Sequence, residues 1–115
     1  MTPHEIRLRG FWELRTTPDG GDRLCRKFGR PRLTDPGETV WLICEACPES
    51  ATLSLNGKEI GQMAPADRLA VEVTTTLTQR NELCVRFSPR TCESPLPTEP
   101  GQVRLEIYPA GGAPG

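Results

Sequence analysis

The amino-acid sequence predicts an all-β protein, an antiparallel β-sandwich of about seven or eight short strands. Apolar and polar residues alternate with the strand period along most of the chain, and no window shows a convincing helical period. Turn-forming Gly, Pro, Asn and Asp separate the alternating runs. At 115 residues the chain is long enough to bury one core. We therefore expect one domain over residues 1–110 and a flexible C-terminal tail at 111–115.

The N-terminal third contains the first predicted strands. The run "EIRLRGFWEL" alternates apolar residues with arginines until Gly10, where we expect a bulge or a bend. The run "RLCRKF" places Leu24, Arg26 and Phe28 on one face. Further strands are expected at residues 40–47, 51–55, 58–63, 69–73, 81–87 and 102–108.

The stretch "ATLSLNGKEIGQM" contains the clearest turn in the chain. Asn56 and Gly57 both tolerate positive φ, so we expect a type I′ turn, whose twist matches that of two paired strands. The preceding run "VWLICEAC" is apolar on both faces, which is typical of a strand at the centre of a sandwich. The segment "SPRTCESPLPTEPG" contains four prolines without amide donors, so it is not expected in a central strand.

The charge is nearly balanced, with 14 Lys plus Arg against 15 Asp plus Glu. No global field recruits nucleic acid or an acidic membrane, so we expect neither as a partner. The N-terminal third has an excess of basic residues, which we interpret as a solvated strand face. The sequence shows no secretory signal and no apolar run long enough to span a bilayer, and we expect a cytoplasmic protein.

The five cysteines are an odd number, which fits a reducing compartment, and we predict that all five are reduced. Cys44 and Cys47 form one CxxC pair, but no second CxxC completes a zinc site. This CxxC also precedes a turn and a strand, whereas a redox CxxC opens a helix. We therefore predict no metal site and no cofactor.

An ordered set of motifs gives the predicted sandwich a family resemblance. The chain contains "RKF", then "PGETVWLICEACPESATLSLNGKEIG", then "LAVEVTTTLTQRNELCVRF". This order resembles the N-terminal jelly-roll domain of family 2 glycoside hydrolases, the sugar-binding domain of β-galactosidases and β-glucuronidases. The resemblance extends over about residues 22–88 and implies a galactose-binding-like jelly roll. The matching positions are Arg26, Phe28, Leu55, Asn56, Gly57, Gly61, Val73, Thr74, Leu77, Asn81 and Leu83.

The chain also departs from that family pattern in ways that bear on function. Only a short segment separates Trp12 from Arg26, where those hydrolases have a long segment rich in Pro, Trp and Tyr. The catalytic barrel with its paired acids is absent from the sequence. Together with the resemblance, these departures predict a free-standing jelly roll without catalytic activity.

Sugar recognition combines an aromatic platform with convergent polar groups, and four residues are our candidates for it: Trp41, Arg86, Arg104 and Tyr108. Arg104 and Tyr108 alternate with apolar residues of their strand, so we expect them to be exposed. Trp41 either caps the core or stands on the outer sheet. With 5% aromatic residues, an extended stacking platform is not expected.

Two other residues attract attention but receive structural roles. Trp12 is expected to pack into the core rather than stack on a sugar. Arg26 lies between inward-facing Leu24 and Phe28, so we expect it to be partly buried against a carboxylate. No catalytic residue is predicted, because no acid pair stands out and His4, the one histidine, lies near the N-terminus.

Three hypotheses follow for the function of the chain. The first is a non-catalytic, galactose-binding-like module that contacts carbohydrate through a concave face. The second is a small protein-interaction or structural domain, which predicts an exposed apolar patch. The third is a minimal glycoside hydrolase-related enzyme, which requires two close carboxylates in a pocket. We rank them in that order, and the sequence leaves the oligomeric state open.

Overall fold

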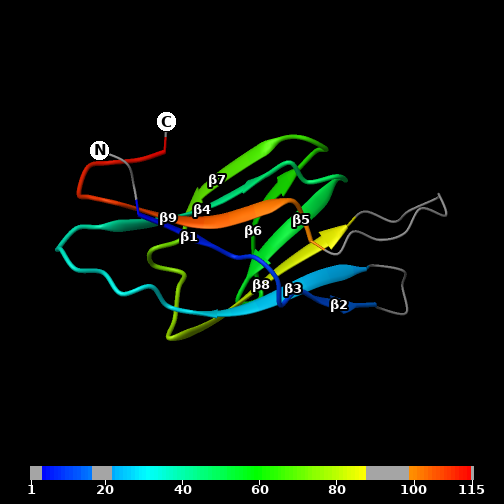
Figure 1. Cartoon of the computed structure of the whole chain (residues 1–115), viewed down its shortest axis with the longest axis horizontal. Helices are drawn as coiled ribbons and strands as arrows, with labels where there is room; N and C mark the ends of the chain where they lie inside the picture. The colour runs from blue at the N-terminus through cyan, green and yellow to red at the C-terminus, as the bar shows by residue number, and fades with distance from the viewer. Residues whose placement is uncertain (1–3, 17–21, 88–98, 115) are drawn as a thin grey trace.

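The computed structural model describes residues 4–16, 22–87 and 99–114, which form two antiparallel sheets without any helix (Figure 1). The first, called here the β4/β9 sheet, has the strand order β1-β9-β4-β7. The second, the β3/β8 sheet, has the order β2-β3-β8-β5-β6. The strands are β1 (His4–Arg7), β2 (Glu13–Arg15), β3 (Arg23–Gly29), β4 (Thr39–Glu45), β5 (Ala51–Leu55), β6 (Lys58–Met63), β7 (Arg68–Glu72), β8 (Arg80–Phe87) and β9 (Gln102–Tyr108).

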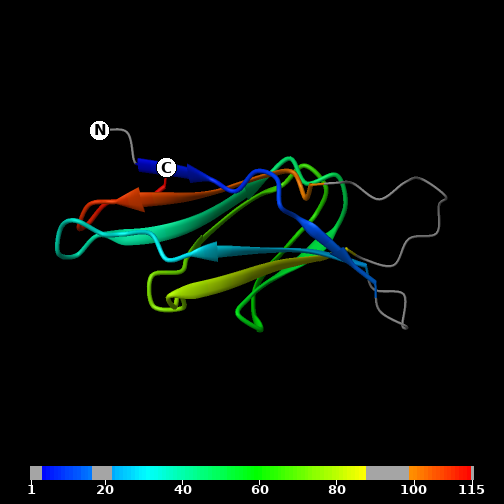
Figure 2. The ribbon, with the colours of Figure 1, turned by 60° about the horizontal axis from the view of Figure 1, so that its bottom comes forward.

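The two sheets stack face to face, as Figure 2 shows, and the core lies between them. Each central strand points alternate apolar residues inward, so the predicted period of two is confirmed. This pattern buries one face of each sheet and leaves the other for polar side chains. The sandwich class is therefore confirmed. The largest buried side chains include Leu42, Leu53, Leu55, Leu83, Val85, Phe87 and Leu105.

The N-terminal run crosses from one sheet to the other. β1 pairs with β9, whereas β2 pairs with β3 in the opposite sheet. Gly10 and Phe11 both have positive φ, +66° and +60°, and turn the chain between the sheets. The expected interruption at Gly10 is confirmed, but the single strand "EIRLRGFWEL" is corrected to two short strands.

The turn at Asn56-Gly57 is confirmed. It joins β5 to β6, and both turn residues have positive φ, 53° and 84°. The Asn56 side chain also connects the turn to a neighbouring strand, because its Oδ1 accepts a hydrogen bond of 2.9 Å from the Glu82 backbone N–H. The hairpin is thereby tied to β8 at the end of the sheet.

The prediction that all five cysteines are reduced is wrong for one pair. Cys25 on β3 and Cys84 on β8 form a disulfide, with a Cα–Cα distance of 4.1 Å. They lie directly opposite each other in the register of the two strands. Their separation of 59 residues along the chain gave no sign of this pairing. Cys44 and Cys47 are free and buried, as expected of structural thiols, and Cys92 lies outside the described residues.

The expected carboxylate partner of Arg26 is also wrong. Its Nε donates to the Gly10 carbonyl at 2.9 Å and its Nη2 to the Arg9 carbonyl at 3.4 Å. The guanidinium also lies 5.8 Å from the centre of the Phe11 ring. Its Nη1 also donates to the Lys27 carbonyl at 3.3 Å, so backbone carbonyls satisfy Arg26 and its role remains structural. Trp12 packs against the core as predicted.

Candidate functional site

Three of the four candidate residues lie on one surface, the outer face of the β4/β9 sheet. Trp41 is opposite Glu106 in the register, and Tyr108 is opposite Thr39 at the end of the same strands. Arg104 lies two residues before Glu106 on β9 and shares its face. Arg86 lies on β8 in the other sheet, so the structure does not bring it to this face.

The centre of this face is a buried carboxylate that sequence reasoning missed. Glu106 is only 5% exposed although it points away from the core. The Arg104 Nε donates to its Oε2 at 2.6 Å, and the Tyr108 hydroxyl donates to its Oε1 at 2.6 Å. The alternation that placed Arg104 on the outside was correct, but its side chain is only 16% exposed, so the expected exposure is wrong.

The network reaches neighbouring strands on both sides of β9. Arg104 also pairs with Glu5 of β1 at 3.1 Å and with Glu45 of β4. Glu45 in turn meets Arg68 of β7, with 3.6 Å between Nε and Oε2. The charged groups of all four strands of this sheet are therefore linked through Arg104 and Glu45.

The network sets the protonation of its members. Burial raises the pKa of Glu106, but the hydrogen bonds from Tyr108 and Arg104 and the nearby positive charges outweigh burial and hold that pKa below its ordinary value. The same bond raises the pKa of Tyr108, because its phenolate would lie beside a carboxylate. Glu106 is therefore an ionised anchor, whereas a general acid needs a raised pKa.

Trp41 stands on the outer sheet, which settles the alternative that the sequence left open. It is half-buried and alternates with the inward-facing Val40 and Leu42. Its Nε1 donates to the Thr39 hydroxyl at 3.1 Å. Of the candidate residues on this face, Trp41 alone has no bond to the Glu106 network.

A polar hollow of about 320 Å³ opens at one end of this face, between β1 and the start of β9. Arg104 and Glu5 form part of its wall, together with Arg7, Arg9 and Glu99. The guanidinium groups of Arg7 and Arg9 make no ion pair or hydrogen bond with another described residue. In the sequence, the only feature pointing to this hollow is the excess of basic residues in the N-terminal third. That excess does not show which arginines lie at the same hollow.

A second, more open hollow of about 750 Å³ lies beside the Asn56-Gly57 hairpin. The side-chain amides of Asn56 and Asn81 at its wall are already used in the fold. Asn81 is 3% exposed, accepts from Asn56 Nδ2 at 3.0 Å and from the Thr78 N–H at 2.8 Å, and donates to the Thr78 carbonyl at 2.9 Å. Asn56 and Asn81, which carry part of the family resemblance, therefore hold loops together.

Within the described ranges, one cluster of potential metal ligands forms. It consists of Cys25, Cys84 and Glu82 on the outer face of the β3/β8 sheet. The Cys44–Cys47 pair does not take part, and burial raises the pKa of Cys44 to about 12, which disfavours the thiolate that metals require.

Comparison with solved structures supports the fold. No protein-family model and no curated protein sequence matches the chain. Among solved structures, an FMN-binding β-glucuronidase from Facaelibacterium prausnitzii matches 94% of this chain with a TM-score of 0.74 and 18% identity. The β-glucuronidase from Bifidobacterium dentium, complexed with coumarin-3-O-glucuronide, matches 95% with a TM-score of 0.73 and 17% identity. A putative β-galactosidase from Bacteroides fragilis matches 93% with a TM-score of 0.70 and 15% identity.

The match covers only part of each of these enzymes. The chain spans 23% of the Facaelibacterium chain and 30% of the Bifidobacterium chain. It therefore has the fold of one domain of such β-glucuronidases, and the resemblance stated from the sequence is confirmed at the level of fold. Separately, no helix among the described residues could cross a membrane.

Proposed function

We propose that the chain is a non-catalytic, galactose-binding-like β-sandwich module that contacts carbohydrate weakly at the hollow between β1 and β9. The observation that supports this best is the pair of guanidinium groups of Arg7 and Arg9, which have no ion pair or hydrogen bond to another described residue, at the wall of a polar hollow. Guanidinium groups donate hydrogen bonds to hydroxyl and carboxylate oxygens alike. The volume of about 320 Å³ lies at the small end of ligand sites and suits one sugar ring.

The proposed contact is weak for a physical reason. The hollow has no aromatic ring among its lining residues, so a sugar ring would lack a stacking surface. Its hydroxyl groups must also exchange water for protein at little net gain per hydrogen bond. We expect dissociation constants at or above about 1 mM for simple galactosides, glucosides and glucuronides.

The electrostatics of the Glu106 network do not favour glycoside hydrolysis at this face. Hydrolysis needs one carboxyl group with a raised pKa as the acid and a second carboxylate across the scissile bond. Glu106, the most buried acid described, has a lowered pKa and both of its oxygens engaged. Glu5 and Glu45 share the same arginine, so these acids serve the network.

Ligand-observed NMR with a panel of neutral sugars and uronic acids tests the proposal. Arg9→Ala is expected to abolish saturation transfer to the sugars. Arg80→Ala, which removes an exposed arginine of the other sheet, is the matched control and should leave it unchanged. If no sugar of the panel receives saturation transfer at about 10 mM, carbohydrate binding is refuted. Binding that Trp41→Ala abolishes and Arg9→Ala spares would move the site to the centre of the face.

A second candidate function, a protein-interaction domain, is favoured by one observation. Phe11 and Leu14 are 89% and 48% exposed; Phe11 lies at the turn between the sheets, and Leu14 lies three residues further on, in β2. An exposed aromatic ring of this kind is typical of an interface anchor. Concentration-dependent sedimentation that Phe11→Ser abolishes would support self-association through this segment. A monomer at all concentrations would restrict this hypothesis to a different partner protein.

A further inference from the structure

We propose that Cys25, Cys84 and Glu82 form a redox-gated binding site for a thiophilic divalent cation such as Zn²⁺ or Cd²⁺. The disulfide closes the site, and its reduction opens it. This inference is independent of carbohydrate binding, because it concerns the outer face of the opposite sheet.

The register of the sheet creates the cluster. β3 and β8 pair antiparallel, with Cys25 directly opposite Cys84. Their Cα atoms are 4.1 Å apart, a short distance typical of a non-hydrogen-bonded pair. The two side chains project to the same side of the sheet. Glu82 precedes Cys84 by two residues on β8, so it points to the same face. The ligand atoms of these three residues all lie within 4.8 Å of one another.

These distances suit a tetrahedral metal ion. With metal–sulfur bonds of about 2.3 Å and metal–oxygen bonds of about 2.1 Å, a bound sulfur and oxygen lie roughly 3.6 Å apart. The Cys84 Sγ and the Glu82 Oε1 are 3.7 Å apart in the structure. Once the sulfur–sulfur bond is broken, small side-chain rotations bring the two sulfurs to the separation of about 3.8 Å that the same geometry requires. Water completes the coordination at the surface.

The opening step has a defined chemical balance. Two thiol molecules, or one dithiol, supply two electrons and two protons, break the Cys25–Cys84 bond and leave as their own disulfide. The cation then replaces the two thiol protons, which pass to solvent. Cys25 is only 2% exposed, but Cys84 and Glu82 are half-buried, so reductant and metal can approach from the Cys84 side, in contrast with Cys44 and Cys47, which are both buried.

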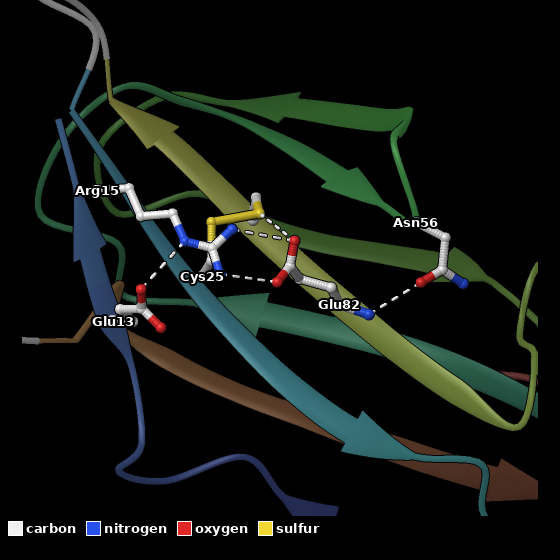
Figure 3. Close-up of polar contacts among 6 residues, drawn as sticks. Glu13, Arg15, Cys25, Asn56 and Glu82 are labelled. Atoms are coloured by element: carbon white, nitrogen blue, oxygen red, sulfur yellow. Dashed lines mark hydrogen bonds and ion pairs between the residues drawn. A yellow bond between two sulfur atoms is a disulfide. The ribbon is translucent and has the colours of Figure 1, made fainter. Parts of the chain in front are cut away.

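Arg15 covers the closed site. Its Nη1 and Nη2 donate to the two oxygens of Glu82 at 3.1 and 2.9 Å, while its Nε lies 3.4 Å from Glu13 (Figure 3). Figure 3 shows its side chain reaching between Glu13 and Glu82, on the face that carries the disulfide. Because this ion pair is partly solvated, it contributes little to stability and can exchange for a metal. Arg15 thus competes with the cation for the Glu82 carboxylate.

The redox half of the proposal is tested by counting thiols in a Cys92→Ser background. Under denaturing, non-reducing conditions we expect two reactive thiols, Cys44 and Cys47, and after mild reduction of the native protein two more. Four thiols in the protein as purified under air would overturn the closed state. Reduction that abolishes the β-sheet circular dichroism would overturn the open state, because the site needs β3 and β8 in register.

The metal half is tested by titrating reduced and oxidised protein with Cd²⁺ and following the thiolate-to-metal charge-transfer absorption. We expect one Cd²⁺ per reduced chain and none per oxidised chain. Cys25→Ser should weaken binding by about 100-fold and Glu82→Gln by about tenfold. Glu59→Gln, which changes an exposed acid of β6 in the same sheet, is the matched control and should change it little. Binding that survives Cys25→Ser would overturn the proposal.

Arg15→Gln distinguishes a metal site from a structural role. Because Arg15 occupies the Glu82 carboxylate, its removal is expected to tighten Cd²⁺ binding by about threefold or more. A purely structural role predicts the opposite sign, since loss of the ion pair would loosen β2. Unchanged or weaker binding in Arg15→Gln would remove Glu82 from the proposed ligand set.

Discussion

Replacing Glu106 by glutamine is expected to destabilise the protein by about 2 kcal/mol. The carboxylate is almost fully buried and accepts two hydrogen bonds of 2.6 Å, from Arg104 and Tyr108. A hydrogen bond to a charged group contributes about 1.5–3 kcal/mol, and glutamine keeps the shape and one acceptor oxygen but loses the charge. Breaking a buried ion pair outright costs about 3–5 kcal/mol. The expected loss is smaller because Arg104 retains Glu5 and Glu45.

The effect of this substitution depends on pH with a definite sign. The pKa of folded Glu106 is lowered, so its stabilising contribution is present above the unfolded pKa of about 4.3 and is lost as the pH falls through the folded value. The gap between wild type and Glu106→Gln should therefore be full at neutral pH and shrink in acid. Tyr108 behaves oppositely: its pKa is raised, so its contribution is lost as the pH rises through the folded value.

Urea unfolding at neutral and acidic pH, with thermal melts in parallel, measures both effects. For a domain of this size, 2 kcal/mol corresponds to roughly 6–10 °C in Tm. Glu72→Gln is the matched control, because Glu72 lies exposed on the same face and opposite Trp41 on β7. An unchanged midpoint for Glu106→Gln, or a gap that grows in acid, would refute the argument that the network holds an ionised carboxylate.

Three further substitutions or treatments probe the fold. Gly57→Val should destabilise by about 1–3 kcal/mol in thermal melts, because φ is +84° although its Cβ would meet no atom within 4 Å. Gly101→Ala should cost at least as much, about 2–4 kcal/mol, because its Cβ would lie 2.5 Å from the Glu45 carbonyl oxygen at φ +97°. Iodoacetamide at pH 8 should leave Cys44 unlabelled in the native state, because burial raises the pKa of this thiol to about 12. Rapid labelling of Cys44, detected by mass spectrometry, would contradict its burial.

Most of the sandwich could be predicted from the sequence because the patterns that specify each strand and turn lie within a few adjacent residues. Alternation along β5, β8 and β9 identifies the inward face without knowledge of the partner strand. The Asn56-Gly57 turn is likewise encoded in two adjacent residues with positive φ. The crossing at Gly10 was visible as an interruption, but the choice of sheet for β2 depends on pairing with β3 and could not be read locally.

The interactions that sequence reasoning missed are those set by register between distant strands. Cys25 meets Cys84, and Arg15 meets Glu82, only because β2, β3 and β8 align in one order. The odd number of cysteines favoured free thiols. It carries no information about which side chains lie opposite one another once the strands pair. Arg26 shows the same limit, since two of the backbone carbonyls that satisfy it come from the crossing segment.

The expected exposure of Arg104 was wrong, and the reason bears on the proposed function. Alternation separates inward from outward residues, but outward does not mean free, because Arg104 and Tyr108 both bind the carboxylate of Glu106. A ligand at the centre of that face would have to break charge-assisted hydrogen bonds that already stabilise the fold. The guanidinium groups of Arg7 and Arg9, at the rim where β1 ends, have no such bonds to any residue in the described part of the chain. For this reason we propose the rim rather than the centre as the site of sugar contact, although the centre holds the aromatic residues.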